Sequence, residues 1–151
     1  MRLDMRMIKH IAVNILLMAL LTIKGSAAMN AKNILGTELV ICGMDPKTGF
    51  FRDGYCNTNA DDHGTHVVCA EVTVTFLEYT KSQGNDLSTP NPLYRFPGLK
   101  PGDKWCLCAL RWQEALNADA APMIVPESTH EKALQLVKKD DLLAHSIHND
   151  R

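Results

Sequence analysis

The chain lacks a surplus of charge of either sign. Its 151 residues carry 16 basic and 17 acidic side chains, for a formal net charge of −1. Non-specific binding to nucleic acid usually needs a basic patch or a high pI, so we expect no nucleic-acid partner. Because 46% of the residues are hydrophobic, an ordinary share for a globular protein, the composition also argues against a mainly disordered chain.

The sequence also lacks internal repeats, low-complexity tracts and any long linker rich in Pro, Gly or Ser. It contains no Walker-type phosphate loop, no G-x-G-x-x-G or G-x-S-x-G motif and no H-E-x-x-H motif. The templates of common nucleotide-binding proteins, serine hydrolases and metalloproteases are therefore unsupported. Residues 29–151 are expected to form a single globular domain.

Residues 1–28 differ from the rest of the chain. Basic residues precede an apolar run at 11–23, and small residues follow it at 25–28. This order predicts a secretory signal peptide that is cut after Ala28. The apolar run is short for a membrane-spanning helix, which needs about 20 residues, so we expect no stable membrane span after cleavage.

Two alternatives to the signal peptide stay open. The segment is an uncleaved anchor or a buried helix, or Met29 is the true start and residues 1–28 are never made. The location of the protein depends on this choice. Use of the leader predicts a periplasmic or secreted protein, whereas translation from Met29 predicts a cytoplasmic one.

Short elements of both kinds are expected along the rest of the chain. Apolar and β-branched runs predict strands at 37–42, 66–72, 105–109 and 123–126, and helices are expected at 74–82, 111–118 and 140–148. Residues 130–136 are ambiguous, and 85–102 carries four prolines, which exclude a regular helix. Strands and helices that do not alternate regularly indicate an α+β fold. We expect a single small compact domain of short strands, two to four short helices and long turn-rich loops.

The chain has five cysteines, an odd number that cannot pair completely within one molecule. In an oxidising compartment we expect up to two disulfides and one free thiol, whereas in the cytosol the thiols would be reduced, buried or metal-bound. The thiol or metal candidates are Cys42, Cys56, Cys69, Cys106 and Cys108. A thiophilic ion such as zinc is the cofactor that such residues would hold.

The C-x-C pair at 106–108 is the most informative part of this set. In a strand the two thiols lie on one face, with Cα atoms about 6.5–7 Å apart. That separation is at or beyond the limit of a relaxed disulfide, so we predict that Cys106 and Cys108 do not pair with each other. His66 and Cys69, three residues apart, would point to opposite faces of a regular strand, which weakens a shared metal site for the two, and a bulge or turn there would restore it.

Several polar clusters are candidates for ligand binding. The candidate residues are Arg52, Asp53, His66, Asn85 and Asp86. Asn85 and Asp86 lie in a polar stretch that is typical of a structural turn or a ligand-binding loop. In the cluster of residues 61–63, a carboxylate beside a histidine could orient the ring for acid–base work. Solvated loop residues are the favoured interpretation of that cluster, because no recognisable nucleophile elbow stands nearby.

Several longer strings carry a resemblance to a known family. They are DPKTGFFRDGYC (45–56), HGTHVVCA (63–70), FLEYTKSQGNDLSTPNP (76–92) and FPGLKPGDKWCLCALRWQEA (96–115), with residues 33–36 leading to Cys42. Together they resemble the bacterial family called domain of unknown function 2237, over about residues 33–148. The resemblance implies a single small domain that commonly begins near Met29, without a leader. The family strings include all five cysteines and His66, whereas His63 is less characteristic, which implies a shared role in packing or in a site.

Three functions remain open at this point. The first is binding of a small ligand or metal through a polar pocket that contains Cys and His. The second is an enzyme of unknown substrate that uses a Cys or His as nucleophile or base. The third is a structural or interaction module whose cysteines are buried in the core.

Overall fold

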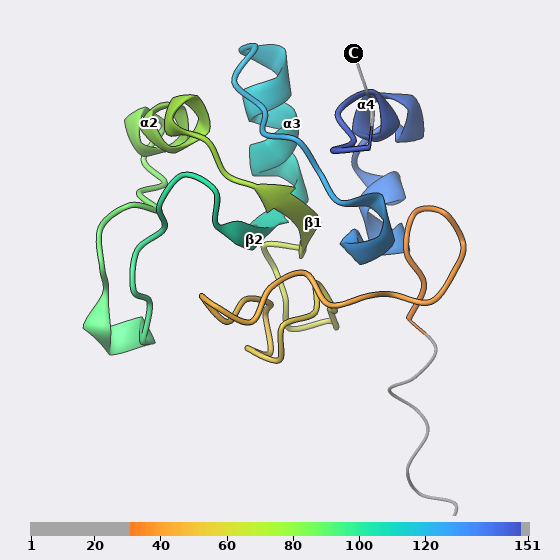
Figure 1. Cartoon of the computed structure of the whole chain (residues 1–151), viewed down its shortest axis with the longest axis horizontal. Helices are drawn as coiled ribbons and strands as arrows, with labels where there is room; N and C mark the ends of the chain where they lie inside the picture. The colour runs from red at the N-terminus through yellow and green to blue at the C-terminus, as the bar shows by residue number, and fades with distance from the viewer. Residues whose placement is uncertain (1–30, 149–151) are drawn as a thin grey trace, which may run out of the picture. The chain divides into compact units, whose positions relative to one another are not determined.

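The computed structural model describes residues 31–148, and the leader expected at 1–28 lies outside the described residues. Figure 1 follows the elements along the chain. Their bounds are β1 (His66–Glu71), α2 (Val74–Ser82), β2 (Lys104–Cys108), α3 (Ala109–Asn117) and α4 (Lys139–Ala144), with 3₁₀ helices at Pro92–Tyr94, Pro126–Ser128 and Glu131–Gln135. Short strands, three short helices and long loops confirm the α+β fold.

The sheet consists of two antiparallel strands, β1 and β2, within a residue or two of the predicted bounds. Cys69 lies opposite Cys106, and His66 lies opposite Cys108. The register shifts between His66 and Val68, so β1 has one more residue than β2 between these two pairs. This bulge brings His66 and Cys69 to the same face of the sheet, although a regular strand would separate them.

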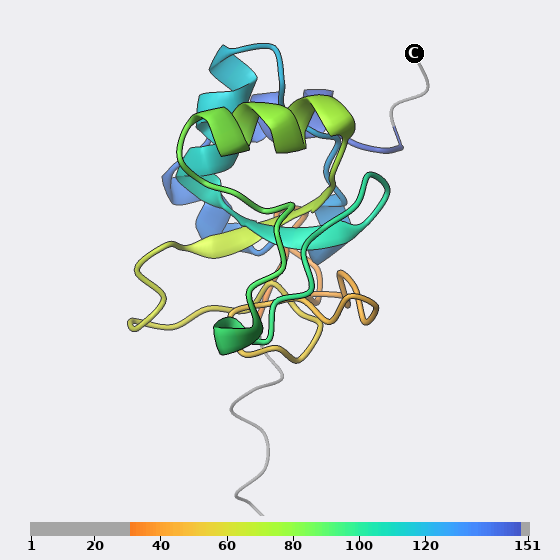
Figure 2. The same ribbon diagram turned by 90° about the vertical axis from the view of Figure 1, so that its left-hand side faces the viewer.

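The helices and the long N-terminal loop lie on opposite sides of the sheet. In Figures 1 and 2 the three helices stand above β1 and β2, and the segment 31–65 runs below them. Helix α2 begins where predicted, because the Thr73 hydroxyl accepts a hydrogen bond from the Phe76 amide at 3.1 Å. Helix α3 follows β2 without a connecting loop.

The main core lies between the sheet and the helices. It includes the fully buried side chains of Phe76, Trp112, Ile124 and Leu142. The one polar atom of the Trp112 ring is satisfied, since Nε1 donates to the Pro122 carbonyl at 3.0 Å. A second, smaller cluster holds four buried cysteines.

The strands predicted at 37–42 and 123–126 are wrong. The Val40 amide donates to Glu127 and the Cys42 amide donates to Gly54, so neighbouring residues pair with different segments and no ladder forms. At 123–126 only Ile124 pairs, through isolated bridges, before a 3₁₀ helix starts at Pro126. Residues 131–135 are a 3₁₀ helix, and the last helix ends at Ala144, earlier than expected.

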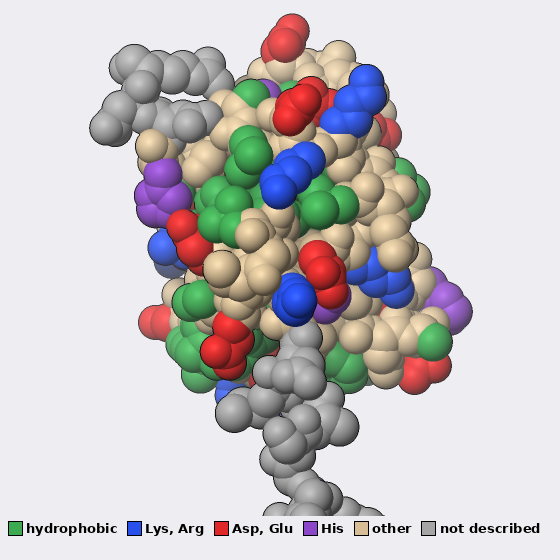
Figure 3. Space-filling view, turned by 90° about the vertical axis from the view of Figure 1, so that its right-hand side faces the viewer, with side chains coloured by type: hydrophobic (Ala, Val, Ile, Leu, Met, Phe, Trp, Pro, Cys, Tyr) green, Lys and Arg blue, Asp and Glu red, His purple; other side chains and the backbone are tan. Residues whose placement is uncertain are grey.

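Within residues 31–148, none of the helices combines the length and the hydrophobicity needed to cross a membrane. On the face drawn in Figure 3, acidic and basic side chains of the described residues are interspersed.

Candidate functional site

Four of the five cysteines form two disulfides. Cys42 pairs with Cys69 and Cys56 pairs with Cys106, with Cα atoms 5.7 Å and 5.2 Å apart respectively. Cys108 is free. Two disulfides and one free thiol are the arrangement expected for an oxidising compartment, and the prediction that Cys106 and Cys108 do not pair with each other is confirmed.

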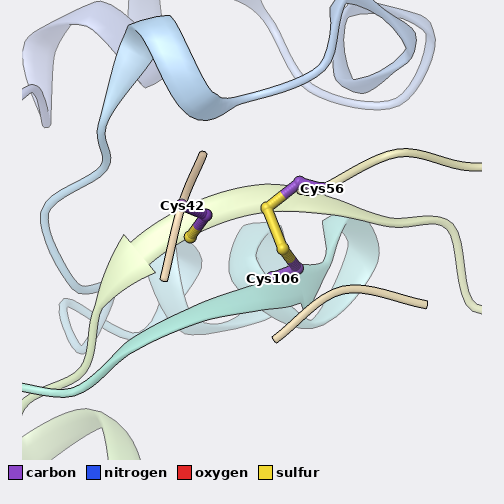
Figure 4. A group of neighbouring side chains, drawn as sticks. All are labelled: Cys42, Cys56 and Cys106. Carbon is purple, nitrogen blue, oxygen red and sulfur yellow. A yellow bond between two sulfur atoms is a disulfide. The ribbon is translucent and has the colours of Figure 1, made fainter. Parts of the chain in front are cut away.

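The two disulfides lie against each other beneath the sheet. Figure 4 shows Cys42 beside the bond that joins Cys56 to Cys106. The sulfur atoms of these three residues all lie within 4.8 Å of one another. Through this cluster the two disulfides fasten the loop that contains residues 42 and 56 to both strands.

A cavity of about 710 Å³ opens beside β2, at the end where α3 begins. The turn at residues 49–52 and the loop at 85–96 form its other walls. The cavity brings together predicted candidates from distant parts of the sequence, namely Arg52, His66, Asn85, Asp86, Cys106 and Cys108. Asp53 is not among the lining residues and instead accepts a hydrogen bond from the Tyr55 amide at 3.0 Å.

His66 is held by a buried carboxylate. Its Nδ1 lies 2.6 Å from Oδ1 of Asp62, whose side chain is 0% exposed. The other carboxylate oxygen accepts hydrogen bonds from the His66 amide at 2.8 Å and from the Thr58 hydroxyl at 2.9 Å. Because the ionised carboxylate can only accept, the hydrogen bond between Asp62 and Nδ1 places the ring proton on Nδ1. Nε2 is then the ring nitrogen that can accept a proton.

Burial and hydrogen bonding act on Asp62 in opposite directions. Desolvation raises the pKa of Asp62, but the hydrogen bonds from His66 and Thr58 outweigh it and bring this pKa below its usual value. The carboxylate is therefore ionised at neutral pH. The favoured interpretation of residues 61–63 as solvated loop was wrong for Asp62, which is buried and pairs with His66 instead of its neighbour His63.

Gly64 allows the histidine ring to take this position. The ring of His66 lies so close to the Gly64 backbone that an added Cβ would overlap Cε1 of the ring. Any other residue at position 64 would therefore displace the imidazole from its place at the cavity. The sequence contains one signal of this close approach between ring and backbone, which is the glycine two residues before His66.

Cys108 is the cross-strand neighbour of His66, and both line the cavity. Cβ atoms of such neighbours are about 4.5–5.5 Å apart. Cys108 is also the residue directly before the first turn of α3. The first amide N–H groups of a helix have no partner within the helix and favour negative charge nearby. Cys108 is therefore both the cross-strand neighbour of His66 and the N-cap residue of α3.

Arg52 occupies the wall of the cavity. Its guanidinium carbon lies 4.9 Å from the centre of the Trp105 ring, and Nη1 donates to the Gly49 carbonyl at 2.9 Å. Burial lowers the pKa of Arg52 from its usual value. The sequence identified Arg52 as a candidate, but it did not reveal Trp105 as its stacking partner or Arg111 as a second basic residue of the lining.

Comparison with known proteins adds a family. A family model described as an uncharacterized protein conserved in bacteria matches residues 32–146. No curated protein matches the chain. The matched region contains the cavity, both disulfides and the free thiol.

Proposed function

The chain belongs to the bacterial family called domain of unknown function 2237, and we propose that it is a thiol-dependent enzyme in which Cys108 is the nucleophile, His66 its base and Asp62 the positioning residue. The observation that carries the proposal is the Asp62–His66 hydrogen bond of 2.6 Å beside the cross-strand partner Cys108. Cysteine enzymes use this order of groups on unrelated folds.

The three groups divide the chemistry between them. The Cys108 thiol gives its proton to Nε2 of His66, directly or through one water, and the thiolate keeps the electron pair with which it attacks an electrophile. The Asp62 carboxylate stabilises the imidazolium that results. The N–H groups at the start of α3 favour the negative charge that develops on the sulfur or on the substrate.

Alkylation of the oxidised full-length chain tests the proposal. With both disulfides intact, Cys108 is the only thiol, so iodoacetamide is expected to add one group per chain and none to Cys108→Ser. His66→Gln is expected to slow the reaction at pH 7 by about tenfold or more. The matched control is His63→Gln, which removes a histidine that does not line the cavity. Equal rates for wild type and His66→Gln would overturn the proposal.

A second candidate function rests on the sulfur cluster. In a reducing compartment, a dithiol would supply two electrons and two protons to each disulfide, and four buried thiols would then stand together. Zinc prefers four such ligands in a tetrahedron, with Zn–S distances of about 2.3 Å. The three sulfur atoms already within 4.8 Å of one another favour this site, with Cys69 as the fourth ligand.

Elemental analysis distinguishes this candidate. Chain prepared with a dithiol reductant and equimolar zinc, then passed through a desalting column, is expected to keep one zinc ion per molecule. Cys56→Ser is expected to lose it, whereas Cys108→Ser keeps it. A reduced, folded sample that retains no zinc would exclude the metal site and leave a structural role for the four cysteines.

The location of the protein decides which of these states it adopts, and we propose export. Two disulfides in a small domain are typical of oxidising compartments. Fractionation of cells that express wild type and Met29→Leu tests this. If the leader is used, both proteins are expected in the exported fraction at similar yield. If Met29 is the start, the variant would give no product.

A further inference from the structure

We infer that the cavity selects a small organic anion with an apolar body, which Arg52 holds by its charge while Cys108 attacks it. This inference rests on the proposed function and adds the class of substrate to it. The starting observation is that Arg52 lines the cavity and has no carboxylate partner among residues 31–148. Arg52 is exposed on the cavity wall, and an unpaired cation in that position can pair with an anionic ligand.

The guanidinium of Arg52 has two contacts within the protein. Its stacking on Trp105 and the hydrogen bond from Nη1 to Gly49 together hold it. The backbone of Arg52 has φ of 54°, a left-handed conformation that a non-glycine residue adopts only where its surroundings hold it. The remaining N–H groups of the planar guanidinium can then bind two oxygen atoms of one carboxylate or phosphate.

The other charged residues of the lining already have partners. Asp86 accepts hydrogen bonds from Ser88 and Thr89, and it pairs with Lys81 at 3.1 Å. Arg111 pairs with Glu114 at 2.9 Å. Asp86 is therefore committed to its own loop and does not neutralise Arg52. The positive charge of Arg52 is left for a ligand.

Aromatic side chains make up much of the remaining wall. Phe96 packs edge-on against Trp105, with ring centroids 5.3 Å apart, and Tyr94 and Phe50 also line the cavity. These surfaces favour a planar or apolar body between the anionic group and the reacting atom. Arg52 and Cys108 line the same cavity, and the Cα atoms of Trp105 and Cys108, three residues apart on β2, are about 10 Å apart, so the class of ligand we infer is one ring with an anionic substituent.

Two aromatic disulfides of different charge test the inference on the oxidised full-length chain. One is 5,5′-dithiobis(2-nitrobenzoate), which carries carboxylates, and the other is the neutral 4,4′-dithiodipyridine. In each reaction the Cys108 thiolate attacks one sulfur, a mixed disulfide forms, and the other aromatic thiolate leaves with the electron pair and is measured by its absorbance. The readout is the ratio of the two rate constants.

Three variants are compared with wild type. Arg52→Gln is expected to lower the rate with the anionic reagent about tenfold, while its rate with the neutral reagent stays within about twofold. Arg52→Lys, which keeps the charge but not the planar fork, is expected to fall between the two. Lys100→Gln, the control, removes a positive charge outside the lining and is expected to change neither rate.

The outcomes separate the two proposals. If neither reagent modifies Cys108, the proposed nucleophile fails, and the substrate class falls with it. If both reagents react but Arg52→Gln and Lys100→Gln change the ratio equally, Cys108 remains a reactive thiol and the anion site is overturned. A ratio that falls only in the Arg52 variants, and that falls in wild type as salt is added, supports the site.

Discussion

At the scale of single residues, Asp62 is the group on which the candidate site depends most. Its carboxylate is buried, accepts three hydrogen bonds and fixes both the tautomer and the position of His66. The local sequence gave no reason to prefer His66 over the adjacent His63 as its partner. The choice follows from the turn at 62–65, where the Thr65 amide donates to the Asp62 carbonyl at 3.0 Å and returns the chain toward the carboxylate.

The lowered pKa of Asp62 predicts a pH dependence of stability. Because the folded chain lowers this pKa, the unfolded chain binds more protons between the folded value and about 3.9. Wild type is therefore expected to be more stable than Asp62→Asn above about pH 4 and to lose this advantage as the pH falls through the folded pKa. Urea unfolding of both proteins between pH 2 and 7 measures the difference. An advantage that does not shrink on acidification would contradict the prediction.

Gly64 gives a second prediction at this scale. In Gly64→Ala the new Cβ would overlap the imidazole, so the His66 ring is expected to leave its position opposite Cys108. Alkylation of Cys108 by iodoacetamide is expected to slow about as much as in His66→Gln, with both disulfides still formed. The control is His63→Ala, which alters the same loop without touching the ring. A second glycine such as Gly84 is not a suitable control position, because its φ of 81° would strain any other residue. An unchanged rate in Gly64→Ala would show that the ring does not act on the thiol.

At the scale of elements, the bulge in β1 organises the site. It brings His66 opposite Cys108 while Cys69 stays opposite Cys106, so one sheet face carries the imidazole at one end and the disulfides at the other. The strand is therefore not regular between His66 and Cys69, and Cys69 is bonded to Cys42 in a disulfide. Helix α3 completes the site, since it starts at the residue after the thiol.

The cap of α2 provides a test of how firmly the elements are held. Thr73→Ala removes the hydroxyl that accepts from Phe76 and is expected to lower the free energy of unfolding by about 1 kcal/mol. Thr73→Ser keeps the acceptor and is expected to lose less. Chemical denaturation of the three proteins measures this, and an equal loss for Ala and Ser would mean that the cap does not stabilise the helix.

At the scale of the whole molecule, the disulfides connect the loop side of the domain to the sheet. They close segments whose ends are 27 and 50 residues apart in sequence. The long segment 31–65 has no strand or helix of its own, so these bonds and the buried Thr48 join it to the sheet. Thr48 accepts a hydrogen bond from the Cys106 amide at 2.8 Å.

Removal of one disulfide is expected to cause a large loss of stability. Replacing Cys42 and Cys69 together by Ala is expected to lower the free energy of unfolding by about 3–4 kcal/mol, because the unfolded chain is no longer constrained. Cys108→Ser, which breaks no disulfide, is expected to change it by less than about 1 kcal/mol. Urea unfolding under non-reducing conditions measures both. A similar small effect for both proteins would mean that the disulfide is not formed.

Local pattern was sufficient for the elements with a strong signal of their own. The continuous apolar run of β1, the threonine cap of α2 and the C-x-C strand were all read from the sequence, as was the family. Residues 37–42 looked equally strand-like, but their amides pair with separate segments, which no local pattern records.

The odd number of cysteines was enough to show that they cannot all pair within one chain, and the separation within C-x-C was enough to exclude one pairing. Which cysteines pair, and that Asp62, His66 and Cys108 meet at one cavity, was decided only by the tertiary structure. The physical reason is that a disulfide, a hydrogen bond to a buried carboxylate and a cavity wall each join residues that the folded chain brings together, and four cysteines alone allow three pairings.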